Sequence, residues 1–368
     1  MFMDYEIDFI GVSKDKSSTN ADAICFRWAT GNGYKIAVYD VGLKAHGEAL
    51  VNHLNKYYFD DVENRLDRYE KKIDYLFISH PHQDHVMGID SVIENFDVGT
   101  IYMNRPWLYK EELETLYSND GRATPNSIGN ELYIDFALIK HIEELADDYG
   151  IKIHEAFQGL SVENRLHVLS PSKAFYLHKI AASTKTDRLD GEMALTESVV
   201  AAARSNEVVE NWNKETIREG ESTDAENETS IVLLGDMDEE RFLLTGDAGN
   251  EALRESIDYE YYLSDIVYLY EVPHHGGRHN VSPSLLNDLL GPILAEGRTT
   301  KRIAVASVAE GSDHPKKMVV NAFTRRGVKV YTTAGSTFWH HYGDMPERKE
   351  FITAEQLPFY KYVESWDD

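Results

Sequence analysis

Apolar and polar positions alternate along the first 45 residues in short runs. Apolar runs at 5–12, 21–28 and 34–39 have the length of β-strands, and Gly31-Asn32-Gly33 separates the second run from the third. Glycine and asparagine between two such runs favour a hairpin, so the pattern predicts an antiparallel meander. The single cysteine, Cys25, lies inside the second run, so we expect its thiol in the core rather than on a metal.

Strand-like and helical patterns then alternate as far as residue 169. We expect strands at 75–79, 98–103, 151–154 and 165–169, and helices over 47–70, 86–94, 111–117 and 131–149. The order resumes after residue 227, with strands expected at 229–234, 241–247, 265–273 and 302–308, a helix that ends near 326 and a further strand from 328. Such alternation is typical of a layered α/β domain.

Residues 172–226 differ in character from the rest of the chain. They are rich in Ala, Glu, Ser, Thr, Lys and Asn, with helical patterns at 192–204 and 208–218 and a polar linker at 219–226. We expect a helical insertion that forms either a lid or an association surface for a second copy or a partner protein. A solvated elaboration fits the composition equally well. The whole chain, 1–368, is then one domain with this insertion.

Composition and net charge disfavour several classes of protein. The chain has 368 residues, 42% of them hydrophobic, and no apolar run approaches the roughly 18 residues of a membrane span, so we expect a globular protein. The N-terminus has neither the basic nor the apolar region of a signal peptide, and one cysteine cannot form an intrachain disulfide, which favours the cytoplasm. The net charge of −26 disfavours sequence-independent adhesion to duplex nucleic acid, although metals in a cleft invert the local potential.

The densest chemistry lies in the six residues His80-Pro81-His82-Gln83-Asp84-His85, between an expected strand and an expected helix. In such a loop His80 and His82 can share one cation, while Asp84 and His85 face a second. Imidazole nitrogens and carboxylate oxygens suit Zn²⁺, and Mn²⁺ or Fe²⁺ when oxygen ligands are added. The alternative, surface histidines with Asp84 as a helix cap, fits a lone pair better than four ligand-type residues in six positions. We therefore expect two divalent metal ions, Zn or Mn.

Four further stretches place polar residues at the ends of expected strands. They are Asp40-Val41-Gly42, Thr245-Gly246-Asp247, His274-His275-Gly276-Gly277 and Asp313-His314-Pro315. Each one alone is common in turns. Their repeated position after strands indicates that they contribute to one site.

The loop at 80–85 resembles the HxHxDH motif of the metallo-β-lactamase superfamily of binuclear metallohydrolases. This resemblance implies a four-layer αββα metallo-β-lactamase fold, with an inserted helical segment in this chain. It also implies that Asp247 lies between the two metals, and that Asp40 supports the metal loop by hydrogen bonds without binding metal. The order TGD, PHHG, SDHP and GVKVYTT resembles the hydrolase domain of ComEC competence proteins over about 5–105 and 227–335, which implies phosphodiester hydrolysis.

Two departures from these relatives affect the expected ligands. His82 stands where the ComEC-type domains often have an acidic residue, and no histidine precedes the strand that leads to Asp247. We therefore expect Asn227, a water or the substrate to complete one metal. His314 is the favoured late metal ligand, His274 a ligand or an acid, and His275 a further catalytic candidate. Asp84 is expected both to bind metal and to orient the nucleophile.

These expectations favour a metal-dependent hydrolase, foremost a phosphodiesterase or nuclease that acts on nucleic acid or a small phosphodiester with a metal-activated water. A hydrolase of a small ester, lactone or thioester is the alternative within enzymes. A metal-stabilised interaction module without catalysis is the alternative outside them. The sequence by itself does not choose among the three.

Overall fold

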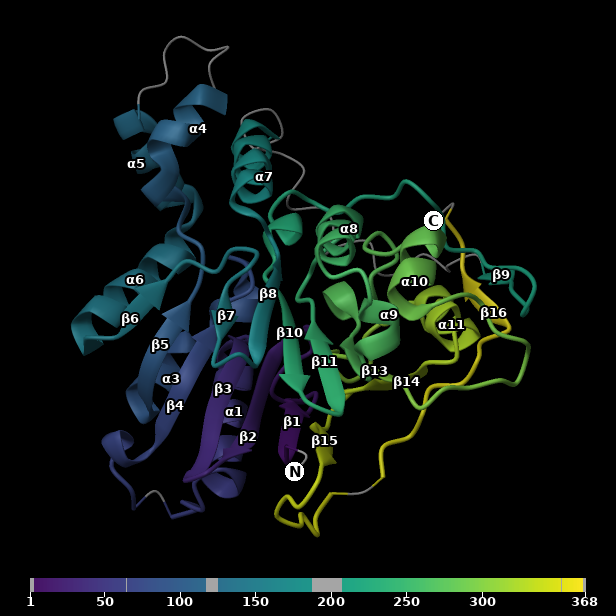
Figure 1. Ribbon diagram of the computed structural model, residues 1–368, viewed down its shortest axis with the longest axis horizontal. Helices are drawn as coiled ribbons and strands as arrows, with labels where there is room; N and C mark the ends of the chain where they lie inside the picture. The colour runs from purple at the N-terminus through teal and green to yellow at the C-terminus, as the bar shows by residue number, and fades with distance from the viewer. Residues whose placement is uncertain (1–2, 64, 117–124, 187–206, 352, 367–368) are drawn as a thin grey trace.

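The structure is a computed structural model that describes residues 3–63, 65–116, 125–186, 207–351 and 353–366. Two seven-stranded sheets form its centre. In Figure 1, α3 and α6 lie beside the strands on the left, and α8 to α11 lie beside those on the right. Within the described residues, no helix combines the length and apolar character that crossing a membrane requires.

The first sheet contains the predicted N-terminal meander. Its strand order is β15 (Phe338–Tyr342), β1 (Tyr5–Phe9), β2 (Ala23–Thr30), β3 (Gly33–Val41), β4 (Lys72–Phe77), β5 (Asp97–Tyr102) and β6 (Lys152–His154). Strands β1 to β3 pair antiparallel, which confirms the meander, and β3 to β6 are parallel. The parallel half therefore ends on one edge of the sheet.

The second sheet is built from the later half of the chain. Its order is β14 (Lys329–Thr332), β13 (Ile303–Ala306), β12 (Leu269–Glu271), β11 (Glu240–Leu244), β10 (Val232–Met237), β8 (Leu166–Ser170) and β7 (Ser161–Val162). Strands β11 to β14 are parallel, whereas β8, β10 and β11 pair antiparallel. Both sheets thus carry a parallel set of strands whose carboxyl ends face one edge.

Helices occupy the chain between these strands. The first half contains α1 (Lys44–Tyr57), α2 (Gln83–Val86), α3 (Ile89–Asn95), α4 (Lys110–Leu116), α5 (Pro125–Asp135) and α6 (Ala137–Tyr149). The second half contains α7 (Lys173–Thr186), α8 (Asn250–Tyr259), α9 (Leu263–Ile266), α10 (Pro283–Leu290) and α11 (Lys317–Arg325). Short 3₁₀ turns are η1 (Arg68–Glu70), η2 (Pro106–Tyr109), η3 (Asn227–Thr229) and η4 (Pro273–Gly276), and β9 (Glu207–Val209) pairs with β16 (Tyr362–Glu364).

Three apolar layers hold the architecture together. Aromatic side chains from both sheets meet in the central layer, where the ring centroids of Phe26 and Phe242 are 4.9 Å apart. A second layer, with Leu50, lies between the first sheet and its helices, and a third, with Phe323, lies between the second sheet and its helices. Helix, sheet, sheet and helix therefore form four layers, which confirms the predicted αββα fold.

Two helix boundaries differ from the prediction. The helix expected over 47–70 ends at Tyr57, because Asp60 adopts a positive φ of 52° and the Asp61 carboxylate accepts hydrogen bonds from the backbone of Arg65 and Leu66. The helix expected over 131–149 is two helices, because Phe136 leaves the helical conformation at φ −108° and ψ 40°. The start of the strand expected at 265–273 lies in the short helix α9.

Part of the predicted insertion lies within the described residues. The helical pattern at 192–204 lies outside the described residues, whereas α7 forms the start of the segment. The helix predicted over 208–218 is wrong, because Val208 and Val209 join β9 and pair with β16, more than 150 residues later. The backbone N–H of Thr216 then donates to the buried Glu210 carboxylate, which replaces helical bonding in this stretch.

The central layer generates a stability prediction. Gly235 in β10 pairs with Phe242, and an added Cβ would lie 2.1 Å from the Phe242 ring. We expect Gly235→Ala to lower the free energy of unfolding by about 1–3 kcal/mol in urea denaturation. Gly31→Ala is the control, because nothing lies within 4 Å of its added Cβ. Equal stability of the two variants would contradict this packing.

Candidate metal centre

The polar strand ends meet where the carboxyl ends of the parallel strands of both sheets converge. Asp40 lies near the end of β3, residues 79–85 follow β4, and residues 245–247 follow β11. The turn η4 follows β12, and Asp22 precedes the antiparallel β2, so Asp22 reaches the same edge. Ligand sites in open parallel sheets form at this edge because several loops leave it in one direction.

The metal loop of the sequence analysis holds three imidazoles close together. His80 and His85 are buried, and His82, at the residue before α2, is partly exposed. The ring centroids of His80 lie 4.1 Å from those of His85 and 4.6 Å from those of His82. Because α2 begins directly after His82, Asp84 and His85 project from its single turn on the side of the second sheet.

Two groups of side chains place their ligand atoms within 4.8 Å of one another. One group is Asp22, His85, Asp247 and His275, and the other is His80, His82 and Asp247. Asp247 is common to both, because its Oδ1 lies 3.3 Å from His85 Nε2 and its Oδ2 lies 3.7 Å from His80 Nε2. The carboxylate thus has an imidazole on each oxygen, the position that the sequence resemblance implies for a bridging residue.

Buried atoms without hydrogen-bond partners test whether these residues suit metal ions. Within the described part of the chain, the atoms of the two groups that lack a hydrogen-bond partner are Asp22 Oδ2, His80 Nε2, His85 Nε2 and Asp247 Oδ1. A buried polar atom without a partner destabilises the folded state by about 1–3 kcal/mol. One divalent cation in each group would satisfy these atoms, and the nitrogen and carboxylate donors suit Zn²⁺ or Mn²⁺. The residues present therefore fit two divalent cations.

Four of the histidines have Nδ1 fixed by an outer hydrogen bond. The partners are Ser79 Oγ for His80 (3.0 Å), Asp40 Oδ2 for His85 (2.7 Å), Asn280 Oδ1 for His274 (2.9 Å) and the Ser307 carbonyl for His275 (2.8 Å). This arrangement leaves Nε2 of each ring directed toward a carboxylate of the site. Outer hydrogen bonds of this kind orient metal-binding imidazoles and fix their tautomer.

Asp40 supports the loop by three hydrogen bonds. Its Oδ1 accepts from the Ser79 backbone N–H (2.7 Å), and its Oδ2 accepts from Ser79 Oγ (2.6 Å) and pairs with His85 Nδ1. The side chain is fully buried and belongs to neither donor group. This geometry matches the supporting role that the resemblance implies for Asp40.

The backbone of the site is strained at several positions. Asp40, His274 and His275 adopt positive φ values of 56°, 49° and 56°. Non-glycine residues in this conformation cost about 1–3 kcal/mol each and persist only where the surroundings hold them. In η4 this conformation brings both adjacent histidines to the site, with His275 Nε2 3.2 Å from Asp84 Oδ2 and His274 Nε2 3.5 Å from Asp247 Oδ2.

In the metal-free site, the carboxylates and the imidazoles shift the pKa values of the histidines in opposite directions. Burial alone would lower the pKa of His85, but the carboxylates of Asp247 and Asp40 raise it well above its ordinary value. Burial likewise opposes charge on His275, yet Asp22 and Asp247 raise its pKa to about 10. His80 shows the opposite shift, because burial and the neighbouring imidazoles hold its pKa well below the ordinary value. In the absence of cations, protons on His85 and His275 thus balance the carboxylates.

The structure places His275 and His314, the histidines predicted from the second half of the chain, in different surroundings. His275 joins the donor group with His85, whereas His314 belongs to neither group and pairs through Nδ1 with Asp313 at 2.9 Å. His275 therefore lies among the converging donors, whereas His314, the late ligand favoured from the sequence, does not. The positive φ values of η4 decide this, because they turn two adjacent rings toward the same carboxylates, and sequence spacing does not reveal them.

The sequence lacks a histidine before the strand that leads to Asp247, and three residues bear on how the group with His80 and His82 is completed. His274 Nε2 approaches the same Asp247 oxygen as His80 does, so His274 is positioned to complete the group with His80 and His82. Asn227 is buried and donates through Nδ2 to Thr223, and its Oδ1 has no hydrogen-bond partner among the described residues. The residue that contacts the metal loop here is Glu226, whose Oε2 lies 3.0 Å from His82 Nε2.

Sequence reasoning missed Asp22 and His46. Asp22 stands in a turn before β2, and no motif distinguishes it from other turn carboxylates. His46, in the first turn of α1, is buried with no partner for Nδ1 in the described chain. Burial and the nearby His275 lower the pKa of His46 to about 4, so its ring is neutral at pH 7.

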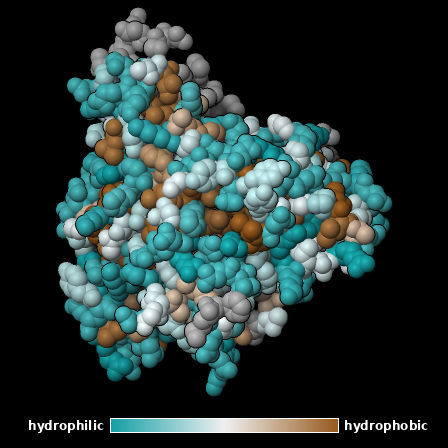
Figure 2. All heavy atoms as spheres, in the orientation of Figure 1, coloured by the Kyte–Doolittle hydropathy of each residue, from teal (hydrophilic) through white to brown (hydrophobic). Residues whose placement is uncertain are grey.

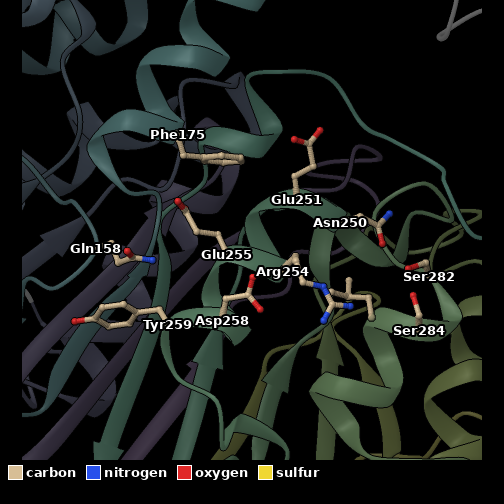
Figure 3. Close-up of a pocket in the computed structure, with 11 residues that line it drawn as sticks. Gln158, Phe175, Asn250, Glu251, Arg254, Glu255, Asp258, Tyr259, Ser282 and Ser284 are labelled. Carbon is tan, nitrogen blue, oxygen red and sulfur yellow. The ribbon is translucent and has the colours of Figure 1, made fainter.

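Two other features of the molecule lie apart from this centre. Asp8, Cys25 and His53 also converge, but the Arg348 guanidinium binds both oxygens of Asp8 and supplies the positive charge there. A cavity of about 670 Å³ lies among α7, α8 and α10, and Figure 3 shows acidic side chains of α8 around it. None of the residues in the two donor groups lines this cavity.

Comparison with known proteins finds similarity over a stretch that includes the loop at 80–85. Residues 30–155 match the model of the Metallo-beta-lactamase superfamily. Unliganded yeast PDE1 aligns with a TM-score of 0.40 and 12% identity over 92% of this chain and 99% of that one. Zn²⁺-bound PqqB from Methylobacterium extorquens aligns with a TM-score of 0.38 and 10% identity over 91% and 99%. A search of curated proteins finds no match.

The donor groups predict different effects for two histidines. We expect His275→Ala to bind about one metal per chain, because it removes a donor from the group with His85. His314→Ala should retain about two, because His314 belongs to neither group. Elemental analysis of chelator-treated, reconstituted protein measures both. A loss of metal in His314→Ala alone would contradict this assignment.

Metal binding should release protons. The raised pKa of His85 and of His275 means that both rings are protonated at pH 7 without metal, and a cation binds only the neutral ring. Affinity should therefore rise with pH toward about 10, the pKa of His275. Isothermal titration at pH 7 in two buffers of different ionisation enthalpy counts the protons. A binding enthalpy that is the same in both buffers would refute the release.

Proposed function

We propose that this protein is a binuclear phosphodiesterase or nuclease, because residues 30–155 match the model of the metallo-beta-lactamase superfamily, a superfamily of metal-dependent hydrolases. Its metals are Zn²⁺ or Mn²⁺. The observation that carries the proposal is the position of Asp247 between two groups of converging donors. Asp247, with donors beside each of its oxygens, would be a ligand common to both cations, and its negative charge would reduce their mutual repulsion.

When bound, the two cations supply positive charge that lowers the pKa of water toward neutrality and stabilises negative oxygens in the transition state. Asp84 would orient the attacking water, because its carboxylate is 27% exposed and lies 3.2 Å from His275 Nε2 at the edge of the donor group. His274, with its side chain 36% exposed, Nδ1 fixed by Asn280 and Nε2 beside Asp247, either completes the group with His80 and His82 or protonates the leaving group. The Ser307 carbonyl holds Nδ1 of His275, so Nε2 is the nitrogen that would bind a cation once it has lost its proton.

A phosphodiester substrate is supported by the groups around the second sheet's loops. The backbone N–H of Lys316 donates to Gly276 of η4 at 3.0 Å, which places the segment with His314 beside His275. Imidazole and ammonium groups are donors for phosphate oxygens. The order of the motifs, which resembles that of ComEC-type hydrolase domains, supports the same reaction class.

The surface charge favours a small phosphodiester or a single-stranded end over long duplex. The chain carries a net charge of −26, and Figure 2 shows that hydrophilic side chains cover most of one face. Close to the site, the carboxylates of Asp224 and Glu226 both act on His82. Because duplex binding depends on many phosphate contacts with cationic groups, a long polyanion is repelled outside the metal centre.

Hydrolysis assays test the proposal. We expect turnover of bis(p-nitrophenyl) phosphate and of single-stranded oligonucleotides with Zn²⁺ or Mn²⁺, and a fall of about 100-fold or more in Asp247→Asn. Asp238→Asn is the matched control, because Asp238 lies in the turn after β10 and pairs with Arg165.

Two outcomes would contradict the proposal in different ways. Turnover of lactones, carboxyl esters or thioesters without turnover of any phosphodiester would assign the chain to the alternative hydrolase class. Two tightly bound metals without turnover of any substrate in the panel would favour an interaction module that the metals stabilise.

A further inference from the structure

His82 differs from the other histidines of the metal centre in which ring nitrogen contacts a residue outside the donor groups. In His80, His85, His274 and His275 the hydrogen bond to an outer residue is made by Nδ1. In His82 it is Nε2, which lies 3.0 Å from Glu226 Oε2. Of the two nitrogens of His82, Nδ1 is therefore the one that remains to bind a cation with His80 and Asp247.

Glu226 is itself held by a residue of the inserted segment. Its Oε1 accepts a hydrogen bond of 2.7 Å from Ser183 Oγ, and Ser183 lies near the end of α7. Ser183 is buried, and the Glu226 side chain is 25% exposed. Each oxygen of the carboxylate thus has a different partner, one in the metal loop and one in α7.

Backbone hydrogen bonds fix the position of Glu226. Its carbonyl accepts from the backbone N–H of Thr229 (2.9 Å) and from Thr229 Oγ1 (2.6 Å), which closes η3. Two residues later, the Ile231 N–H donates to the carbonyl of Ser79, the residue before His80 (3.1 Å). Glu226 is therefore attached to the metal loop through the backbone as well as through its side chain.

We propose that Glu226 is a positioning residue for His82, and that Ser183 couples the inserted segment to the metal centre through it. The Glu226 carboxylate accepts the Nε2 proton, which keeps Nδ1 unprotonated, so that it can bind a cation with His80 and Asp247. The proposal rests on the proposed function, because it takes His82 to be a metal ligand. It gives α7 a role at the site that its distance in sequence from the metal loop does not suggest.

The effect on metal binding follows from the chemistry of imidazole. A carboxylate on the opposite nitrogen makes the ring a better donor and restricts its rotation, and losing such a partner weakens metal binding by about 10–100-fold. The loss should be confined to the group with His80, because Asp22, His85 and His275 make no hydrogen bond to Glu226 or Ser183 among the described contacts.

Metal titration of four variants tests the proposal. Metal-free protein is titrated with Zn²⁺ against a chelating dye, for wild type, Glu226→Ala, Glu226→Gln and Ser183→Ala, with Glu219→Ala as control. Glu219 lies on the same segment but accepts from Ser284 in α10. We expect Glu226→Ala to weaken one of two sites by about 10–100-fold. Glu226→Gln should lose less, because its amide oxygen still accepts the Nε2 proton, and Glu219→Ala should match wild type.

A second measurement reports the tautomer directly. Long-range ¹H–¹⁵N spectra of metal-free protein, with His82 assigned by comparison with His82→Gln, should show the Nε2–H form in wild type. Glu226→Ala should shift His82 toward a mixture of tautomers, whereas Glu219→Ala should leave it unchanged. A role limited to folding would not change the tautomer in protein whose circular dichroism and thermal unfolding match wild type.

The outcomes separate this proposal from the proposed function. Unchanged affinity and an unchanged tautomer in Glu226→Ala, while wild type binds two metals, would overturn the positioning role alone. Equal, severe losses in Glu226→Ala and Glu226→Gln would make Glu226 a direct ligand and also overturn it. Wild type that binds no metal would remove the proposed function. Should Glu226→Ala fail to fold, Glu226→Gln and Ser183→Ala still measure the coupling.

Discussion

One buried carboxylate sets the requirements for the rest of the site. Asp247 is 1% exposed and has imidazoles beside both oxygens, so its negative charge is stable only while protons or cations balance it. In the metal-free protein, His85 and His275 carry those protons. Bound cations would replace them, and the rings must then keep their orientation without the protons. This explains why so many surrounding groups serve only to hold imidazoles.

Those groups come from both halves of the molecule. Ser79 and Asp40, from the first sheet, hold His80 and His85, while residues of the second sheet's loops hold His274 and His275. Neither sheet supplies a complete donor group, because Asp247 of the second sheet takes part in both. The aromatic layer between the sheets, which fixes their separation, is thus also what fixes the distance between the donors.

The segment between β8 and β10 contacts other parts of the structure at three points. Glu226 contacts His82, the Glu228 carboxylate accepts from the backbone of Ala252 at the start of α8, and β9 pairs with the C-terminal strand β16. The described part of this segment therefore contacts residues that are distant in sequence, and Glu226 joins it to the loop at 80–85.

The sequence alone determined the layered fold and the metal loop, because strand periodicity and six adjacent residues are local properties. It also indicated Asp40 and Asp247, through their positions after strands. Only the tertiary structure placed His275, and not His314, among the converging donors, and brought Asp22 and Glu226 to the same place. These depend on backbone conformation in tight turns and on which loops two packed sheets bring to one edge, and neither leaves a periodic pattern along the chain.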